Sequence, residues 1–132
     1  MKFLLDTSAV LALMETRDRN HAAAKAFAKK SRTARFVVSD LVLSEIGTRL
    51  RARAGAEGAA RCVLHLLHAE TSDVVFADRD LIESAAAEMV RFADKELSLV
   101  DCLSFVLMDR LHLPAAFTFD RDFLDCGFRM VP

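Results

Sequence analysis

Four acidic residues of this sequence are the ones most able to do chemistry, because three of them stand where strands and helices are expected to meet and the fourth borders the apolar face of a predicted helix. Asp6 follows the apolar run KFLL, and Asp120 follows the run AAFTF. Asp101 stands in LSLVDCLSF, and Glu45 stands in LVLSEIG. Unpaired buried carboxylates cost several kcal/mol. Acids that replace apolar residues at such places, without matching lysines or arginines, therefore need a cation.

A hard divalent ion suits these acids, because Mg²⁺ and Mn²⁺ prefer oxygen ligands and bind through few protein groups together with substrate phosphate. A metal in such a place can activate water and neutralise charge that develops on a phosphodiester oxygen. Hydroxyl groups near the acids are expected to support the carboxylates or to contact phosphate, and they belong to Thr7, Ser8, Ser98 and Thr118. The residues alone predict a divalent-metal site.

Each of these residues also has a purely structural interpretation. Asp6 can cap the helix that follows it, and Asp120 can initiate a turn. Residues 98–101 have the S-x-x-D spacing of a capping box, and Glu45 can pair with Arg49 one helical turn later. For the hydroxyls, capping alone is an equal alternative. Taken together, however, the structural interpretations do not explain why acids replace apolar residues at the strand ends.

Strands and helices are predicted to alternate along the whole chain. Apolar runs predict strands at 2–5, 36–38, 73–76, 115–119 and 128–131. Helical spacing and caps predict helices at 9–13, 20–30, 40–55, 57–70, 78–92 and 98–113, with a hairpin turn at 55–58 and a loop at 120–127. This order predicts a three-layer α/β/α sandwich with a central, mostly parallel sheet. Ligand sites of such sheets lie at the carboxyl ends of the strands, where Asp6 and Asp120 fall.

The composition predicts one domain over residues 1–132, with 53% hydrophobic and 28% charged residues. A formal net charge of −1 neither suggests nor excludes a nucleic-acid partner, so RNA contact would need a local basic patch. The three cysteines show no CxxC spacing and stand in apolar surroundings. No apolar stretch is long enough for a membrane helix. We expect a cytoplasmic protein with free thiols and no membrane contact.

Four segments of the chain resemble the PIN-domain family and, within it, the small VapC-type ribonuclease toxins of prokaryotic toxin–antitoxin pairs. The segments are FLLDTSAVLAL, VVSDLVLSEIGTRL, LSLVDCLSFVLM and AAFTFDRDF, and the resemblance extends over essentially the whole length. The acidic site of that family falls here on Asp6, Glu45, Asp101 and Asp120. One departure is Cys102, which replaces the usual alanine with a residue of similar bulk.

The resemblance implies a PIN-like fold and an endoribonuclease that depends on Mg²⁺ or Mn²⁺. Asp6, Asp101 and Asp120 are the expected main metal ligands, and Glu45 is expected to help hold the metal or to position water. Asp122 stays outside the expected site, because this position varies within the family. The implied partners are an RNA substrate, a second copy of the chain in a homodimer, and a cognate antitoxin.

Three arginines are candidates for RNA contact. Arg49 and Arg53 follow Glu45 on the same predicted helix at intervals of four residues, so they form a basic row that can hold phosphates. Arg121 stands beside Asp120. Arginines near the end of a helix are also expected from the helix dipole, so a structural role for this row remains the alternative.

Two other functions compete with the nuclease. A PIN fold that no longer cuts could serve as an RNA- or protein-binding scaffold, but the presence of all four acids argues against it. A phosphoacceptor signalling domain also clusters aspartates around Mg²⁺. That chemistry needs an acceptor aspartate after the third strand and a lysine after the last, and neither Asp78 nor any C-terminal lysine fits.

Overall fold

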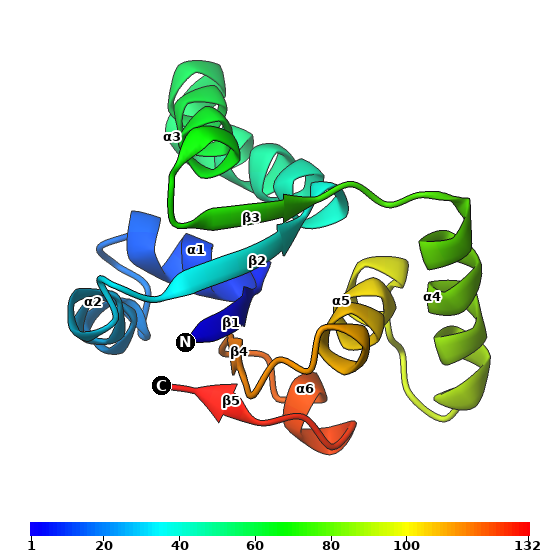
Figure 1. Ribbon diagram of the computed structural model, residues 1–132. Coiled ribbons are helices and arrows are strands. Elements are labelled where there is room, and N and C mark those ends of the chain that lie inside the picture. Colours follow the sequence, from blue (N-terminus) through cyan, green and yellow to red (C-terminus); the bar gives the residue numbers. More distant parts are fainter.

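A single five-stranded sheet organises the chain, and the computed structural model describes all residues, 1–132. The strand order is β3-β2-β1-β4-β5, and all four pairings are parallel (Figure 1). The strands are β1 (Lys2–Leu5), β2 (Arg35–Ser39), β3 (Ser72–Val75), β4 (Ala116–Phe117) and β5 (Met130–Val131). Their carboxyl ends therefore meet at one edge, and β1 lies at the centre.

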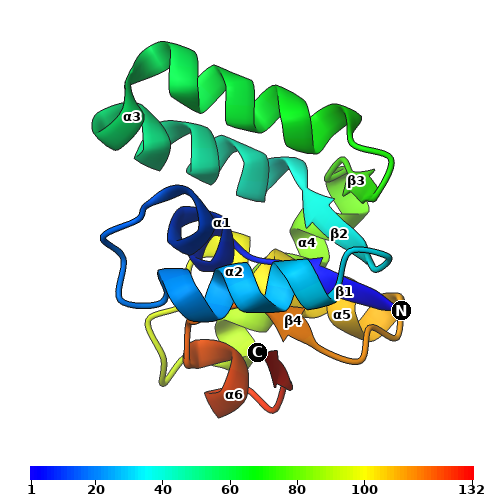
Figure 2. The same ribbon diagram turned by 90° about the vertical axis from the view of Figure 1, so that its left-hand side faces the viewer.

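Six helices cover the two faces of this sheet (Figures 1 and 2). One side carries α1 (Thr7–Met14), α2 (His21–Lys30) and α3 (Asp40–His68), and the other carries α4 (Arg79–Arg91), α5 (Leu99–Arg110) and α6 (Asp122–Asp125). This arrangement confirms the expected α/β/α architecture with a parallel sheet. None of the helices combines the length and the apolar character that crossing a bilayer requires.

The core consists of two apolar clusters, one on each face of the sheet. Successive side chains of a strand point to opposite faces, so neighbouring strand residues enter different clusters. The cluster beneath α1, α2 and α3 receives Leu5, Val38 and Phe117. The cluster beneath α4, α5 and α6 receives Leu4, Val37 and Ala116. Both faces are covered, which explains why the strands read as continuous apolar runs.

The α3 segment is a helical hairpin rather than one straight helix. Gly55 has φ 77° and ψ 172°, a conformation essentially restricted to glycine, and the chain reverses there (Figure 2). The turn thus falls inside the predicted range of 55–58. Only the first half of α3, which follows β2 directly, carries Glu45 and the arginine row.

Four sequence-based boundaries differ from the structure near the carboxyl end. The predicted helix at 98–113 ends at Arg110, and the predicted strand at 128–131 is reduced to Met130–Val131. The predicted strand at 115–119 is reduced to Ala116–Phe117, because the amide of Phe119 donates to Ser8 Oγ instead of to a neighbouring strand. The predicted loop at 120–127 contains the short helix α6. Phe123 of that helix is completely buried and packs edge-on against Phe105 of α5, which fixes the loop to the core.

Candidate active site

Asp6 lies at the carboxyl end of the central strand and is only 5% exposed. β1 is paired on both sides, and the amide of Asp6 itself donates to the carbonyl of Phe117 at 3.1 Å. Asp6 also caps α1, since its carboxylate accepts the amide of Ser8 at 3.3 Å. The capping interpretation of Asp6 is therefore correct, but it does not account for the other hydrogen bonds of this carboxylate.

Two hydroxyls converge on a single oxygen of Asp6. Ser8 Oγ donates to Oδ2 at 2.7 Å, and Thr118 Oγ1 donates to the same atom at 2.8 Å. Each hydroxyl also accepts an amide from the chain after β4, from Phe119 at 2.9 Å and from Asp120 at 3.0 Å. No protein donor reaches Oδ1. The network therefore ties α1 to the end of β4 and leaves one Asp6 oxygen available to a ligand.

Asp101 lies in the first turn of α5 and forms the expected capping box. Its amide donates to Ser98 Oγ at 3.1 Å, and its Oδ2 accepts the amide of Ser98 at 3.3 Å. Burial nevertheless raises the pKa of Asp101 from 3.8 to about 6, and the negative charges of Asp6 and Asp120 add to this effect against the Ser98 bonds. A capping role alone does not explain why this carboxylate lies where burial and neighbouring charges disfavour its ionised form.

Three carboxylates form a cluster at this edge of the sheet. One carboxylate oxygen from each of Asp101, Asp120 and Asp122 lies within 4.8 Å of the other two. Asp122 is drawn in because its amide donates to Asp120 Oδ1 at 2.9 Å as α6 begins. Burial and the charge of Asp120 raise the pKa of Asp122. Asp122 lies outside the site expected from the sequence, although the D-x-D spacing in FTFDRDF is a signal for it.

Asp6 borders this cluster without belonging to the tightest group of oxygens. Desolvation raises the pKa of Asp6 despite its hydrogen bonds, and the charge of Asp120 raises it further. None of the four aspartates takes part in an ion pair with lysine or arginine. Four neighbouring carboxylates without a basic partner make a donor set of oxygens that fits a hard divalent cation.

The remaining candidate residues differ in the contacts that they make. Glu45 pairs with Arg49 at 3.7 Å, as the structural interpretation expected, and shares no hydrogen bond with the aspartates. Arg121 is exposed and directly precedes α6 without a side-chain hydrogen bond to that helix. Thr7 Oγ1 is buried without any hydrogen-bond partner, next to Asp6 in the chain. The structure thus brings together the aspartates and the hydroxyls of Ser8 and Thr118. Glu45 is connected to this edge through its ion-pair partner Arg49, which lines one cleft with Ser8 and Asp120.

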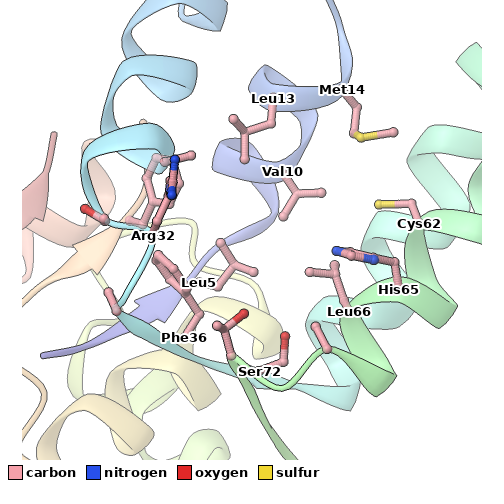
Figure 3. Close-up of a pocket in the computed structure, with 16 residues that line it drawn as sticks. Leu5, Val10, Leu13, Met14, Arg32, Phe36, Cys62, His65, Leu66 and Ser72 are labelled. Carbon is pink, nitrogen blue, oxygen red and sulfur yellow. The ribbon is translucent and has the colours of Figure 1, made fainter.

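Two cavities flank α1. A polar cleft of about 560 Å³ is lined by Ser8 and Asp120 of the site and by Arg49 and Arg53 of α3. A second cavity of about 360 Å³ lies between α1, α2 and the second half of α3, with mainly apolar side chains directed into it (Figure 3). None of the acidic residues lines the apolar cavity, so only the polar cleft can serve the chemistry of the aspartates.

Comparison with known proteins assigns the family. The sequence pattern of the PIN domain matches residues 3–128. VapC20 of Mycobacterium tuberculosis (strain ATCC 25618 / H37Rv), named a 23S rRNA-specific endonuclease, is 34% identical over 125 residues, which cover 94% of this chain and 93% of that protein. Ribonuclease VapC26 of the same strain is 30% identical over 118 residues, covering 89% and 86%. The chain therefore belongs to the PIN-domain family, among its VapC-type members.

Solved structures agree with this assignment. The crystal structure of Mycobacterium tuberculosis VapC20, described as a toxin that cleaves the sarcin–ricin loop, superimposes with a TM-score of 0.87 at 31% identity and covers 96% of this chain and 95% of that one. A toxin–antitoxin complex from Klebsiella pneumoniae gives a TM-score of 0.70 at 16% identity, covering 98% and 96%. The second likeness supports the fold alone. The predicted family and fold are confirmed.

Proposed function

We propose that this chain is a metal-dependent endoribonuclease that acts as the toxin of a toxin–antitoxin pair. The observation that carries the proposal is the convergence of Asp6, Asp101, Asp120 and Asp122 without any ion-pair partner. Its setting adds support, since the cluster borders a cleft lined with arginine in a chain 34% identical to an rRNA endonuclease.

Asp6, Asp101 and Asp120 are the proposed metal ligands, and Asp122 is added to them because its carboxylate shares the cluster. Glu45 is proposed to position water or the metal. When bound, Mg²⁺ or Mn²⁺ would supply an activated water and offset the charge that grows on the phosphodiester oxygens. Without a cation, burial raises the pKa of Asp101 and Asp6, and repulsion from the neighbouring carboxylates raises both further.

The other proposed site residues act by holding these carboxylates or the substrate. Ser8 and Thr118 fix one oxygen of Asp6 by hydrogen bonds of 2.7 and 2.8 Å, so the other oxygen keeps a constant direction. Ser98 does the same for Asp101. Thr7 Oγ1, which has no partner in the chain, is the hydroxyl left to bind a ligand atom.

Contact with the RNA is proposed for three arginines, Arg49, Arg53 and Arg121. Two of them line the cleft beside Asp120, and the third follows Asp120 in the chain. We further propose a cognate antitoxin as protein partner and a homodimer as the assembly. Sedimentation would then give twice the chain mass of 14.6 kDa.

Purified protein should cleave RNA in the presence of Mg²⁺ or Mn²⁺, and excess EDTA should stop the cleavage. The first RNAs to test are 23S rRNA and its isolated sarcin–ricin loop, because the VapC20 relative is named for them. Asp101→Asn should reduce the cleavage rate by at least about a hundredfold, since the amide keeps the shape of the side chain but loses the charge that holds the ion. The rate follows from the loss of intact RNA on a denaturing gel.

The matched control is Asp125→Asn, which removes an exposed carboxylate of α6 outside the cluster and should leave the rate unchanged. Undiminished cleavage in EDTA would remove the metal from the proposal. If folded wild type binds RNA but cuts none with either metal, the non-cutting scaffold becomes the better description.

Inducing the wild-type chain alone should arrest growth of a bacterial host, and co-expression of the cognate antitoxin should restore growth. Asp6→Ala should be harmless, because it removes a proposed ligand while leaving the apolar residues of β1 in place. Colony counts and immunoblots would compare strains at equal protein level. Equal toxicity of soluble Asp6→Ala would show that the harm comes from binding rather than from cleavage.

A further inference from the structure

The polar cleft beside the aspartates extends to a segment that has no role in the proposed function. The loop between α1 and α2 contributes Arg19 and Asn20 to the lining of this cleft, and none of the clustered aspartates belongs to that loop. Asp120 and Ser8 line the same cleft, so the loop and the site share one continuous space of about 560 Å³. A strand whose phosphate sits at the aspartates has this cleft as its continuation.

The three arginines of the cleft differ in how their charge is satisfied. Arg53 donates to Glu15 at 2.7 Å, and Arg49 pairs with Glu45 at 3.7 Å. Arg19 forms no ion pair and no side-chain hydrogen bond with the protein. An anion that enters the cleft must compete with a carboxylate for Arg49 or Arg53, whereas Arg19 is free to bind it.

The neighbouring residues of the loop leave the charge of Arg19 without a partner. Asp18, the other acidic residue of the lining, accepts the amide of Asn20 at 2.7 Å through Oδ1, so this carboxylate is engaged with the backbone. The side chain of Asn20 caps no helix amide and remains available as a neutral hydrogen-bond donor. A guanidinium beside a free amide suits a phosphodiester, which offers charge and acceptor oxygens together.

We propose that Arg19, assisted by Asn20, binds a backbone phosphate of the RNA strand beyond the bond that is cut. This inference rests on the proposed nuclease function and adds the path of the substrate from the aspartates across α1 to the α1–α2 loop. The cleft lining is mostly polar, and phosphate contacts fix the register of a strand without reading its bases. Arg19 therefore contributes affinity and strand placement, not sequence preference.

The test is binding of a short single-stranded RNA to the full chain in EDTA, followed by fluorescence anisotropy at several salt concentrations. Without the metal the RNA stays intact, so binding is measured apart from cleavage. Loss of one phosphate contact should lower the slope of log K against log salt by about 0.7, which corresponds to roughly fivefold weaker binding at 0.1 M salt. Arg19→Ala should show this change, and Arg19→Lys should recover part of it.

The matched control is Arg17→Ala, which removes the same charge from the same loop but outside the cleft. It should bind RNA as wild type does, and circular dichroism should show both alanine variants folded. Equal binding by the two variants would overturn the inference and leave the nuclease proposal untouched. If an acidic peptide of equal charge bound as tightly as the RNA and lost as much on Arg19→Ala, the cleft would be a protein-binding site instead.

The two proposals fail in different ways. A wild-type chain that never cuts RNA with metal, yet binds RNA through Arg19 with the expected salt slope, would disprove the nuclease and sustain the strand path. A chain that cuts RNA with the same KM for wild type and Arg19→Ala would disprove the strand path and sustain the nuclease.

Discussion

Single residues of the site combine structural duties with an unsatisfied charge. Asp6 and Asp101 both cap helices, as their sequence positions alone would suggest, and both are disfavoured as anions by burial. A residue that only caps an exposed helix can do so without the free-energy cost of burying its carboxylate. Capping together with burial distinguishes these proposed ligands from residues that only cap a helix, and it can be measured as a dependence of stability on pH.

In the absence of metal, the protein should lose stability as pH rises from about 4 to about 6. The folded state raises the pKa of Asp101 from 3.8 to about 6, mainly through burial, so the native chain binds more protons than the unfolded chain in this window. The stabilising contribution is complete below the unfolded pKa and is lost above the folded one. Asp6 and Asp122 shift in the same direction.

Urea midpoints in EDTA across this range would test the effect. Asp101→Asn should flatten the profile by roughly 1–2 kcal/mol, less than the full shift implies because water screens a partly exposed carboxyl. The opposite shift at Asp73, whose hydrogen bonds from Arg35 lower its pKa to about 2, acts below this window and does not interfere. Parallel profiles for variant and wild type would mean that Asp101 titrates normally.

Most of the site could be predicted from residue types at strand ends, but its membership could not be completed. Asp6, Asp101 and Asp120 follow from the parallel topology, because strand ends and the helix after them share an edge. Asp122 depends on a turn of α6 that orients its carboxyl towards Asp120, and periodicity cannot detect a helix of four residues. Glu45 shows the reverse limit, since its helix is correct while its contact with the aspartates stays a prediction.

Among the elements, the α3 hairpin depends most sharply on one backbone conformation. Gly55→Ala should lower the free energy of unfolding by about 1–3 kcal/mol, because φ 77° with ψ 172° is open to glycine almost alone. The added methyl meets nothing within 4 Å, so the cost is conformational and not steric.

Gly47→Ala on the same helix is the matched comparison. Its backbone is helical and the new Cβ meets Val63 at an ordinary contact of 3.4 Å, so the change should raise stability by up to about 1 kcal/mol. Thermal melts of the two variants should therefore shift in opposite directions. Shifts of the same sign would show that packing between the halves of α3 outweighs backbone preference.

Helices and strands long enough to bury a face were predicted in type and order, although the helix predicted at 98–113 ends at Arg110. The errors that change the type or most of the length of an element fall on the shortest ones. β1 and β2 are set by apolar runs that enter both clusters. β4 is shortened because Ser8 takes the amide of Phe119, a side-chain contact between residues more than a hundred positions apart. Local patterns carry no information about such a partner, so the strand was predicted to continue two residues past Phe117.

In the molecule as a whole, the candidate site lies between the central strand of the sheet and a short helix. β1 is the central strand, with β2 on one side and β4 on the other, whereas α6 is a helix of four residues beside the edge strand β5. Asp6 directly follows β1, and Asp122 belongs to α6. The proposed ion would therefore join the most firmly paired segment of the chain to one of its shortest helices.

Amide hydrogen exchange should make this difference visible. The amides of β1 should exchange only when the whole chain unfolds, while those of α6 should exchange through local opening. Added Mg²⁺ should slow exchange in α6 about a hundredfold at a hundred times its dissociation constant, because local opening there would release the ion. The second half of α3 can open without disturbing the aspartates, and its exchange should stay constant. Unchanged exchange in α6 would mean that this helix contributes nothing to holding the ion. Slowed exchange would mean that the bound cation stabilises the short helix. The concentration of free metal would then determine what fraction of the protein has α6 formed and is able to act.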